Sequence, residues 1–150
     1  MIKKNKSFYT ILLIILLLFT LTGCGQGPAL SAEEFKTISE LEKYNISDVS
    51  SDEIYNSQEA YFAIDRKGNF QVEFYVFANE EDAKNIFNKI KETLDSDIYE
   101  IKKTWFSDRW LAKSNWSYVV ISKIDNTLVY SSSSSIYEQE INNLLSALEY

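Results

Sequence analysis

The sequence predicts an α+β fold in which three helices pack on an antiparallel sheet. Three segments carry apolar residues at helical spacing, and each begins with a residue type that caps helix N-termini. Between these segments the apolar residues alternate every second position, which is typical of strands. The predicted order is helix, strands, helix, strands, helix. Packing on one face of an antiparallel sheet would bury all three helical stripes at once.

The first two helices are predicted from a capping signal and the stripe that follows it. Residues 31–34 have the capping-box sequence Ser-Ala-Glu-Glu, and the stripe behind it uses Phe35, Ile38 and Leu41. A looser form of the same signal, Asn-Glu-Glu-Asp at 79–82, precedes the second helix. The second stripe consists of Ala83, Ile86, Phe87, Ile90 and Leu94.

A second capping box, Ser-Ile-Tyr-Glu at 135–138, predicts the third helix. Its stripe consists of Tyr137, Ile141, Leu144, Leu145 and Leu148. The preceding serine run, 131–135, has the composition of a linker or a glycosylation target. It lies directly between a predicted strand and the helix cap, so we assign it to the end of the strand.

Two hairpins account for most of the predicted strands. The first has strands near 60–66 and 69–77 with a turn at Lys67-Gly68, and its second strand places Tyr75 on the face opposite Phe74. The second hairpin, within 114–135, turns at Asp125-Asn126. Shorter strands are predicted near 108–113 and 45–49.

The order of elements suggests an internal duplication of a helix-plus-strands unit. Overlaying Ser31 on Asn79 aligns Glu33 with Glu81, Lys36 with Lys84, Ile38 with Ile86 and Lys43 with Lys91.

The N-terminal 23 residues have the features of a secretory signal. Three lysines precede an apolar stretch whose uninterrupted part, 11–19, is much shorter than the roughly 20 residues of a membrane-spanning helix. Leu21-Thr22-Gly23-Cys24 follows, and this order resembles the lipobox of bacterial lipoproteins. The resemblance implies that residues 1–23 are removed and that Cys24 carries a thioether-linked diacylglycerol. Cys24 would then be an anchor on the extracytoplasmic face of the cell membrane, and no catalyst.

Residues 24–30 would form a short tether, spanning at most roughly 20 Å, and residues 31–150 a single domain. Removal of three lysines from 15 basic side chains leaves 12 against 22 acidic ones, a formal net charge of −10. A negative surface is repelled by phosphate backbones, so we expect no nucleic-acid partner. Because Cys24 is the only cysteine, no intramolecular disulfide can form.

The composition offers little for catalysis. The chain has no histidine and no free thiol, and its four glycines form no phosphate-binding loop. Its acidic clusters lack the spacing of a calcium loop. We therefore predict no cofactor, no metal site and no catalytic residue. A carboxylate pair assembled by the fold remains as the alternative, and it would make the protein a cell-envelope hydrolase.

All three tryptophans lie in residues 104–116, where they could fill a core or form a recognition surface. Alternation places Trp116 in a strand, where it could pair with Trp110 across a turn as part of the core. Trp105 lies in an irregular segment near Arg109, and exposed aromatics beside arginine are typical binding anchors. We favour core packing for the set, with Trp105, Arg109 and Tyr75 as a candidate recognition surface.

The chain resembles small lipoproteins of unassigned function from low-GC Gram-positive bacteria. The resemblance rests on the lipobox and on "SAEEF" (31–35), "GNFQVEFYVF" (68–77), "EEDA" (80–83) and "YVVISKIDNTLVY" (118–130). It implies location and a single domain, and no reaction. We expect a non-catalytic binding module, anchored to the membrane through Cys24, whose partner is another envelope protein or a peptide.

Overall fold

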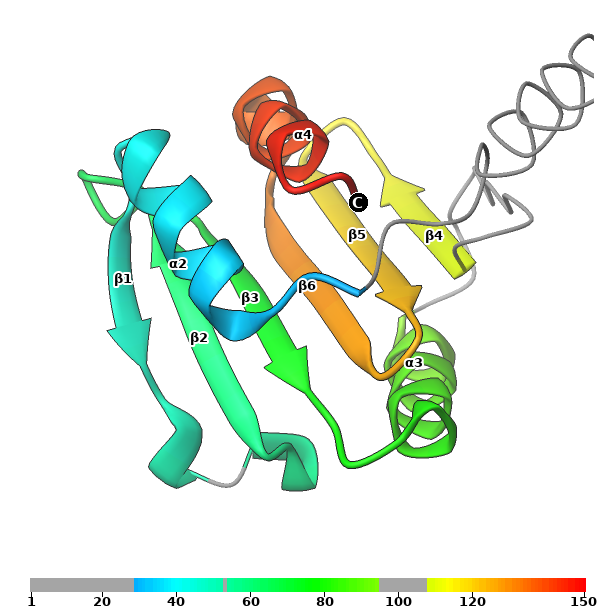
Figure 1. Ribbon diagram of the computed structural model, residues 1–150. Helices are drawn as coiled ribbons and strands as arrows, with labels where there is room; N and C mark the ends of the chain where they lie inside the picture. The colour runs from blue at the N-terminus through cyan, green and yellow to red at the C-terminus, as the bar shows by residue number, and fades with distance from the viewer. Residues whose placement is uncertain (1–28, 53, 95–107) are drawn as a thin grey trace, which may run out of the picture.

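The computed structural model describes residues 29–52, 54–94 and 108–150. Within these residues it contains three α-helices and a six-stranded antiparallel sheet (Figure 1). The helices are α2 (Ala32–Leu41), α3 (Glu80–Thr93) and α4 (Glu138–Ala147). The strands are β1 (Asn45–Asp48), β2 (Glu59–Ile64), β3 (Gln71–Val76), β4 (Asp108–Lys113), β5 (Ser117–Ile124) and β6 (Thr127–Ser134). The predicted α+β class is confirmed.

The sheet consists of two three-stranded meanders that meet in its centre. The strand order is β1-β2-β3-β6-β5-β4, so each meander runs from an edge strand inward. The two halves join through the antiparallel pairing of β3 with β6, in which Glu73 lies opposite Tyr130 and Val76 opposite Thr127. No helix in the described part of the chain is both long enough and apolar enough to cross a bilayer.

The helices cover both faces of the sheet, and the prediction that all three pack on one face is wrong. α2 and α4 lie on one face, where Phe35 stacks on Phe74 with ring centroids 4.7 Å apart. α3 lies on the other face and packs against β5 and β6. β5 is buried on both sides from Tyr118 to Lys123, as a strand between two helical layers must be.

The first two helix starts have the predicted caps. The Ser31 hydroxyl accepts the Glu34 backbone N–H at 3.3 Å, and the Glu34 carboxylate accepts the Ser31 backbone N–H at 2.9 Å, which completes the capping box. Asn79 caps α3 by accepting the backbone N–H of Asp82 at 2.9 Å. The third cap is wrong: Ser135–Tyr137 forms a 3-10 turn, and α4 begins only at Glu138 without a side-chain cap.

The helical stripes are correct for α3 and α4 and partly wrong for α2. Phe87 and Ile90 of α3 are buried, as are Ile141, Leu144 and Leu145 of α4. In α2, by contrast, Leu41 is 74% exposed and Ser39 is fully buried. The turn of a helix is 3.6 residues long, so the position four residues after Phe35 faces the sheet more directly than the position six residues after it.

Both hairpins, the short strands and the assignment of the serine run are confirmed. Gly68 adopts φ +71° in the first turn, and Asp125 adopts φ +47° in the second. β6 continues through Ser134, and the Ser131 hydroxyl donates to the Gln71 carbonyl of β3 at 2.7 Å. The serine run therefore belongs to the sheet.

The structure does not show the suggested duplication. Each meander runs from an edge strand inward, so a duplication would match β1, β2 and β3 with β4, β5 and β6. Because β3 and β6 are antiparallel neighbours, only a two-fold axis perpendicular to the sheet could superpose one meander on the other. Such an axis would place the matching helices, α2 and α3, on the same face of the sheet. They lie on opposite faces.

Two large aromatic side chains should differ sharply in their contribution to stability. Phe87 is 7% exposed in the α3 core, so Phe87→Ala should lower the free energy of unfolding by about 3–5 kcal/mol. Trp116 is 85% exposed, and Trp116→Ala should change it by no more than about 0.5 kcal/mol. Denaturant titration measures both values, and similar losses in the two variants would contradict the assigned burial.

Candidate functional site

The three tryptophans do not form one cluster. Trp110 is buried under α3 and lies opposite Ile121, so its assignment to the core is confirmed. Trp116 lies in the turn between β4 and β5, is 85% exposed and does not pair with Trp110, so its assignment to the core is wrong. Trp105 lies outside the described residues.

Tyr75 does not belong to an exposed recognition surface, because only 1% of it is accessible. Its hydroxyl donates to the Glu73 carboxylate at 2.5 Å, and its ring contacts Tyr55 edge-on with centroids 5.5 Å apart. Burial, reinforced by the negative charge of Glu73, raises the pKa of Tyr75 far above the usual value. Tyr75 is therefore a neutral core residue on the α3 face.

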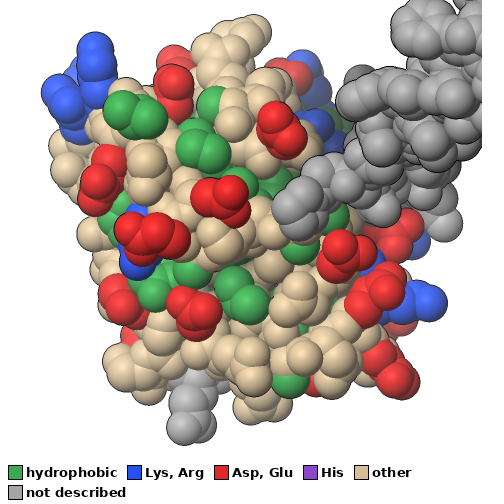
Figure 2. All heavy atoms as spheres, in the orientation of Figure 1, with side chains coloured by type: hydrophobic (Ala, Val, Ile, Leu, Met, Phe, Trp, Pro, Cys, Tyr) green, Lys and Arg blue, Asp and Glu red, His purple; other side chains and the backbone are tan. Residues whose placement is uncertain are grey.

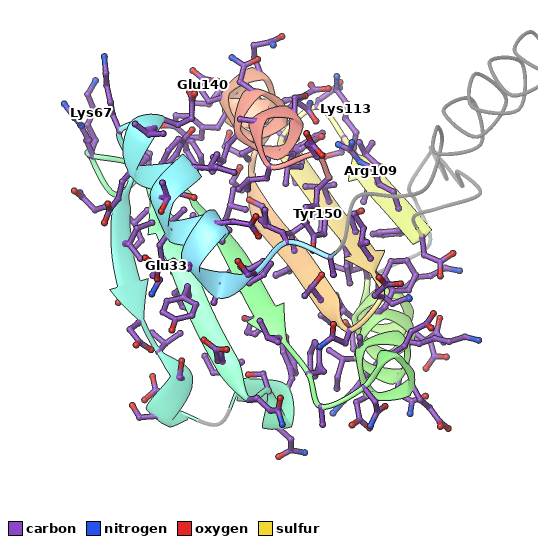
Figure 3. The ribbon with its side chains drawn as sticks, in the orientation of Figure 1. Glu33, Lys67, Arg109, Lys113, Glu140 and Tyr150 are labelled. Atoms are coloured by element: carbon purple, nitrogen blue, oxygen red, sulfur yellow. The ribbon has the colours of Figure 1, made fainter. Side chains whose placement is uncertain are left out.

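Arg109 is half-buried and holds the C-terminus of the chain in place (Figure 3). Its guanidinium donates to the Asn142 side chain at 2.9 Å and to the Tyr150 carbonyl at 3.3 Å. The Tyr118 hydroxyl donates to the same Asn142 oxygen at 2.7 Å. These bonds connect β4, β5 and α4, so Arg109 has a structural role in this part of the fold.

Four segments that are distant in sequence meet at one end of the sheet, which we call the turn end. They are residues 41–45 after α2, the β2–β3 turn at 65–70, the β4–β5 turn at 114–117, and the 3-10 turn with the start of α4 at 135–140. The strand register requires this arrangement, because Ile64 lies opposite Asn45 and Gln71, and Ser117 lies opposite Ser134. In Figure 1 the turn end is the upper edge of the molecule.

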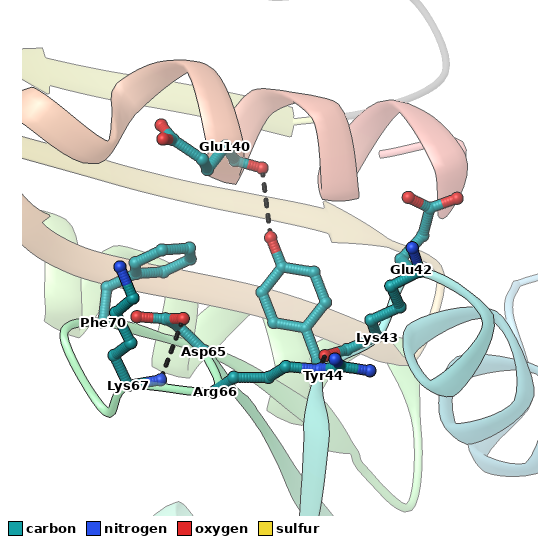
Figure 4. A pocket seen from close by; sticks show the side chains of 8 residues that line it. All are labelled: Glu42, Lys43, Tyr44, Asp65, Arg66, Lys67, Phe70 and Glu140. Carbon is teal, nitrogen blue, oxygen red and sulfur yellow. Dashed lines mark hydrogen bonds between the residues drawn. The ribbon is translucent and has the colours of Figure 1, made fainter.

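A pocket of about 310 Å³ opens at the turn end (Figure 4). The rings of Tyr44 and Phe70 line it and meet edge-on with centroids 5.9 Å apart. The Tyr44 hydroxyl donates to the Glu140 carbonyl of α4 at 3.4 Å, and burial raises the pKa of this hydroxyl. The remaining lining residues are charged: Glu42, Lys43, Asp65, Arg66, Lys67 and Glu140.

The backbone positions the charged rim of this pocket. Lys43 adopts φ +70°, which turns the chain from α2 into β1, and its carbonyl accepts Nε of Arg66 at 2.9 Å. The Asp65 carboxylate accepts the backbone N–H groups of Lys67 and Asn69 at 3.1 and 3.2 Å. These bonds hold the pKa of Asp65 below its usual value. Asp65 therefore stabilises the turn that carries Arg66 and Lys67.

The exposed large apolar side chains of the described residues all lie at the turn end. They are Leu41, Trp116 and Ile136, with exposed fractions of 74%, 85% and 71%. Trp116 and Ile136 belong to adjoining segments, because the Ser135 backbone N–H donates to the Trp116 carbonyl at 3.2 Å and the Ser135 hydroxyl donates to the Asn115 carbonyl at 2.8 Å. Adjoining exposed apolar side chains, here Trp116 and Ile136, are a feature of interaction surfaces, whereas Leu41 lies apart from them beside the edge strand β1.

The two ends of the sheet also differ in charge. The four segments of the turn end hold three cations, Lys43, Arg66 and Lys67, and four carboxylates, Glu42, Asp65, Glu138 and Glu140. One of these carboxylates, Glu138, is paired with Lys113 at the end of β4. The opposite end carries an excess of acids: Asp48, Asp52, Glu59, Glu80, Glu81, Asp82, Asp108 and Asp125 against Lys84 and Lys123. Figure 3 shows Lys67, Glu140 and Lys113 along the same edge, and Figure 2 shows Lys and Arg side chains gathered at the upper left, over the β2–β3 turn.

In the part of the chain that the structure describes, no three metal-ligating side chains converge. The arrangement at the turn end is suited to binding, because two aromatic rings line the pocket and charged side chains form its rim. Sequence patterns did not reveal this site. Its residues are single positions in four separate turns, and only the antiparallel register brings them together.

Comparisons with protein-family models, with curated proteins and with solved structures found no match for this chain.

Proposed function

We propose that the protein is a lipoprotein held on the extracytoplasmic face of the cell membrane by acyl chains on Cys24, and that its folded domain is a non-catalytic binding module. The turn end is the binding surface. The observation that carries this proposal is that one end of the sheet holds all three exposed apolar side chains of the described residues, three cations and a pocket lined by Tyr44 and Phe70.

Anchoring is supported by the sequence before the domain. Leu21-Thr22-Gly23-Cys24 has the order of a lipobox and follows directly on a short apolar stretch. Leu30 already packs against the core beneath α2 and α4, so the folded domain begins only a few residues after Cys24. Two acyl chains satisfy the two-signal requirement for stable membrane attachment.

A binding role is supported over catalysis by the carboxylates at the pocket. A general acid needs a pKa near the working pH, whereas hydrogen bonds hold the pKa of Asp65 below its usual value. Glu42 and Glu140 are exposed to solvent on the rim of the pocket. The acids at this site are therefore better suited to holding the turn and tuning the charge of the rim than to hydrolysis.

Replacement of Cys24 tests the anchor directly. Cys24→Ala removes the sulfur that carries the diacylglyceryl group, so the variant should retain residues 1–23, whereas the wild type should begin at Cys24 and carry that group. Intact-mass spectrometry of protein purified from membranes distinguishes these forms. An unmodified Cys24 in the wild type, or cleavage at another bond, would contradict the anchoring.

Site-specific photo-crosslinking in native membranes tests the binding surface. A benzophenone side chain at Asn115, in the exposed turn beside Trp116, should give crosslinked products. The same group at Glu81, exposed on α3 at the opposite end, is the matched control and should give none. Equal yields from the two positions, or products from Glu81 alone, would show that the turn end is not the binding surface.

A further inference from the structure

The exposed apolar side chains of the turn end are spread across the width of the sheet. Leu41 lies on one side of the pocket, where α2 leads into the edge strand β1, and Trp116 lies at the start of β5. Four strand spacings separate β1 from β5, a distance of about 19 Å. A partner that contacts all three side chains must therefore be broad.

The chemistry of these side chains matches the surface of a phospholipid bilayer. Tryptophan is enriched at the membrane–water interface, and aliphatic side chains such as those of Ile136 and Leu41 enter the boundary between headgroups and acyl chains. Arg66 and Lys67 stand on the same end with long, exposed side chains that can bind lipid phosphates while their stems lie along apolar surface.

The tether keeps the domain close to the bilayer. Five residues from Cys24 to Ala29 span at most about 17 Å. The two ends of the sheet are farther apart than this, because the eight residues of β5 that join them extend over about 26 Å. Charge then decides between the ends, because an anionic membrane repels the acidic opposite end. At the turn end cations nearly balance acids, and the excess acids of the opposite end lie more than a Debye length of about 10 Å away.

We infer that the ligand of the turn end is the phospholipid surface itself. Trp116, Ile136 and Leu41 enter the headgroup region, Arg66 and Lys67 contact lipid phosphates, and the acidic end points away from the membrane. This inference rests on the proposed anchoring through Cys24. It adds a fixed orientation of the domain to an attachment that acyl chains alone would leave free to rotate.

Thiol labelling of the acylated full chain in vesicles tests this orientation. The protein is inserted from outside into vesicles of phosphatidylcholine and phosphatidylglycerol in equal parts, and a membrane-impermeant maleimide is added. Wild-type protein should not react, because the sulfur of the only cysteine, Cys24, is already bonded to the diacylglyceryl group as a thioether. Asn115→Cys should react several-fold more slowly in vesicles than in detergent, whereas the control Glu81→Cys should react equally fast in both. Adding Trp116→Ser or Ile136→Ser to the Asn115→Cys chain should restore fast reaction.

The outcomes separate the inference from the proposed function. Labelling of wild-type Cys24 would overturn the anchoring and the orientation together. Unreactive Cys24 with equally fast labelling at Asn115→Cys and Glu81→Cys would overturn the orientation alone. Slow labelling at Asn115→Cys that neither serine variant relieves would also overturn it, as would protection that appears only when proteins from the native membrane are added.

Discussion

The pairing of β3 with β6 is the constraint on which the rest of the structure depends. It joins two meanders that have no other strand contact in the described sheet. The resulting sheet has apolar side chains on both faces, and helices must pack on both to bury them. α2 and α4 cover one face and α3 the other, where the buried Lys123 ammonium binds the Glu80 carboxylate at 3.1 Å and fixes the start of α3. The same antiparallel register sends alternate turns to opposite ends, which assembles the turn end from four separate segments.

Much of the fold follows from sequence, because its signals are local. The caps at Ser31 and Asn79, the turn at Gly68 and the alternation along β3 each need only a few neighbouring residues. Periodicity shows that a helix has a buried side, but not which face of the sheet receives it. The continuous apolar run from Tyr118 to Ile121 was the available signal for a strand buried on both faces.

The site could not be predicted, because its residues are set by turn geometry and long-range register. Alternation extends the β5 pattern back to Trp116, but the Ser114 hydroxyl accepts the backbone N–H groups of Trp116 and Ser117 at 3.2 and 3.0 Å and closes a turn there. Trp116 therefore stands at a corner in solvent. Arg66 and Lys67 are ordinary turn residues in the sequence, and only the fold places them at the same end of the sheet as Leu41 and Trp116.

Hydrogen exchange of the acylated protein tests most directly whether the turn end is the face that meets the membrane. The hairpin turns at 114–117 and 125–126 lie at opposite ends of the same strand β5, so each is a control for the other. The account predicts that moving the protein from detergent into lipid vesicles slows exchange at 114–117 and leaves 125–126 unchanged. Equal exchange at 114–117 in vesicles and in detergent, or slowing at both turns, would contradict it.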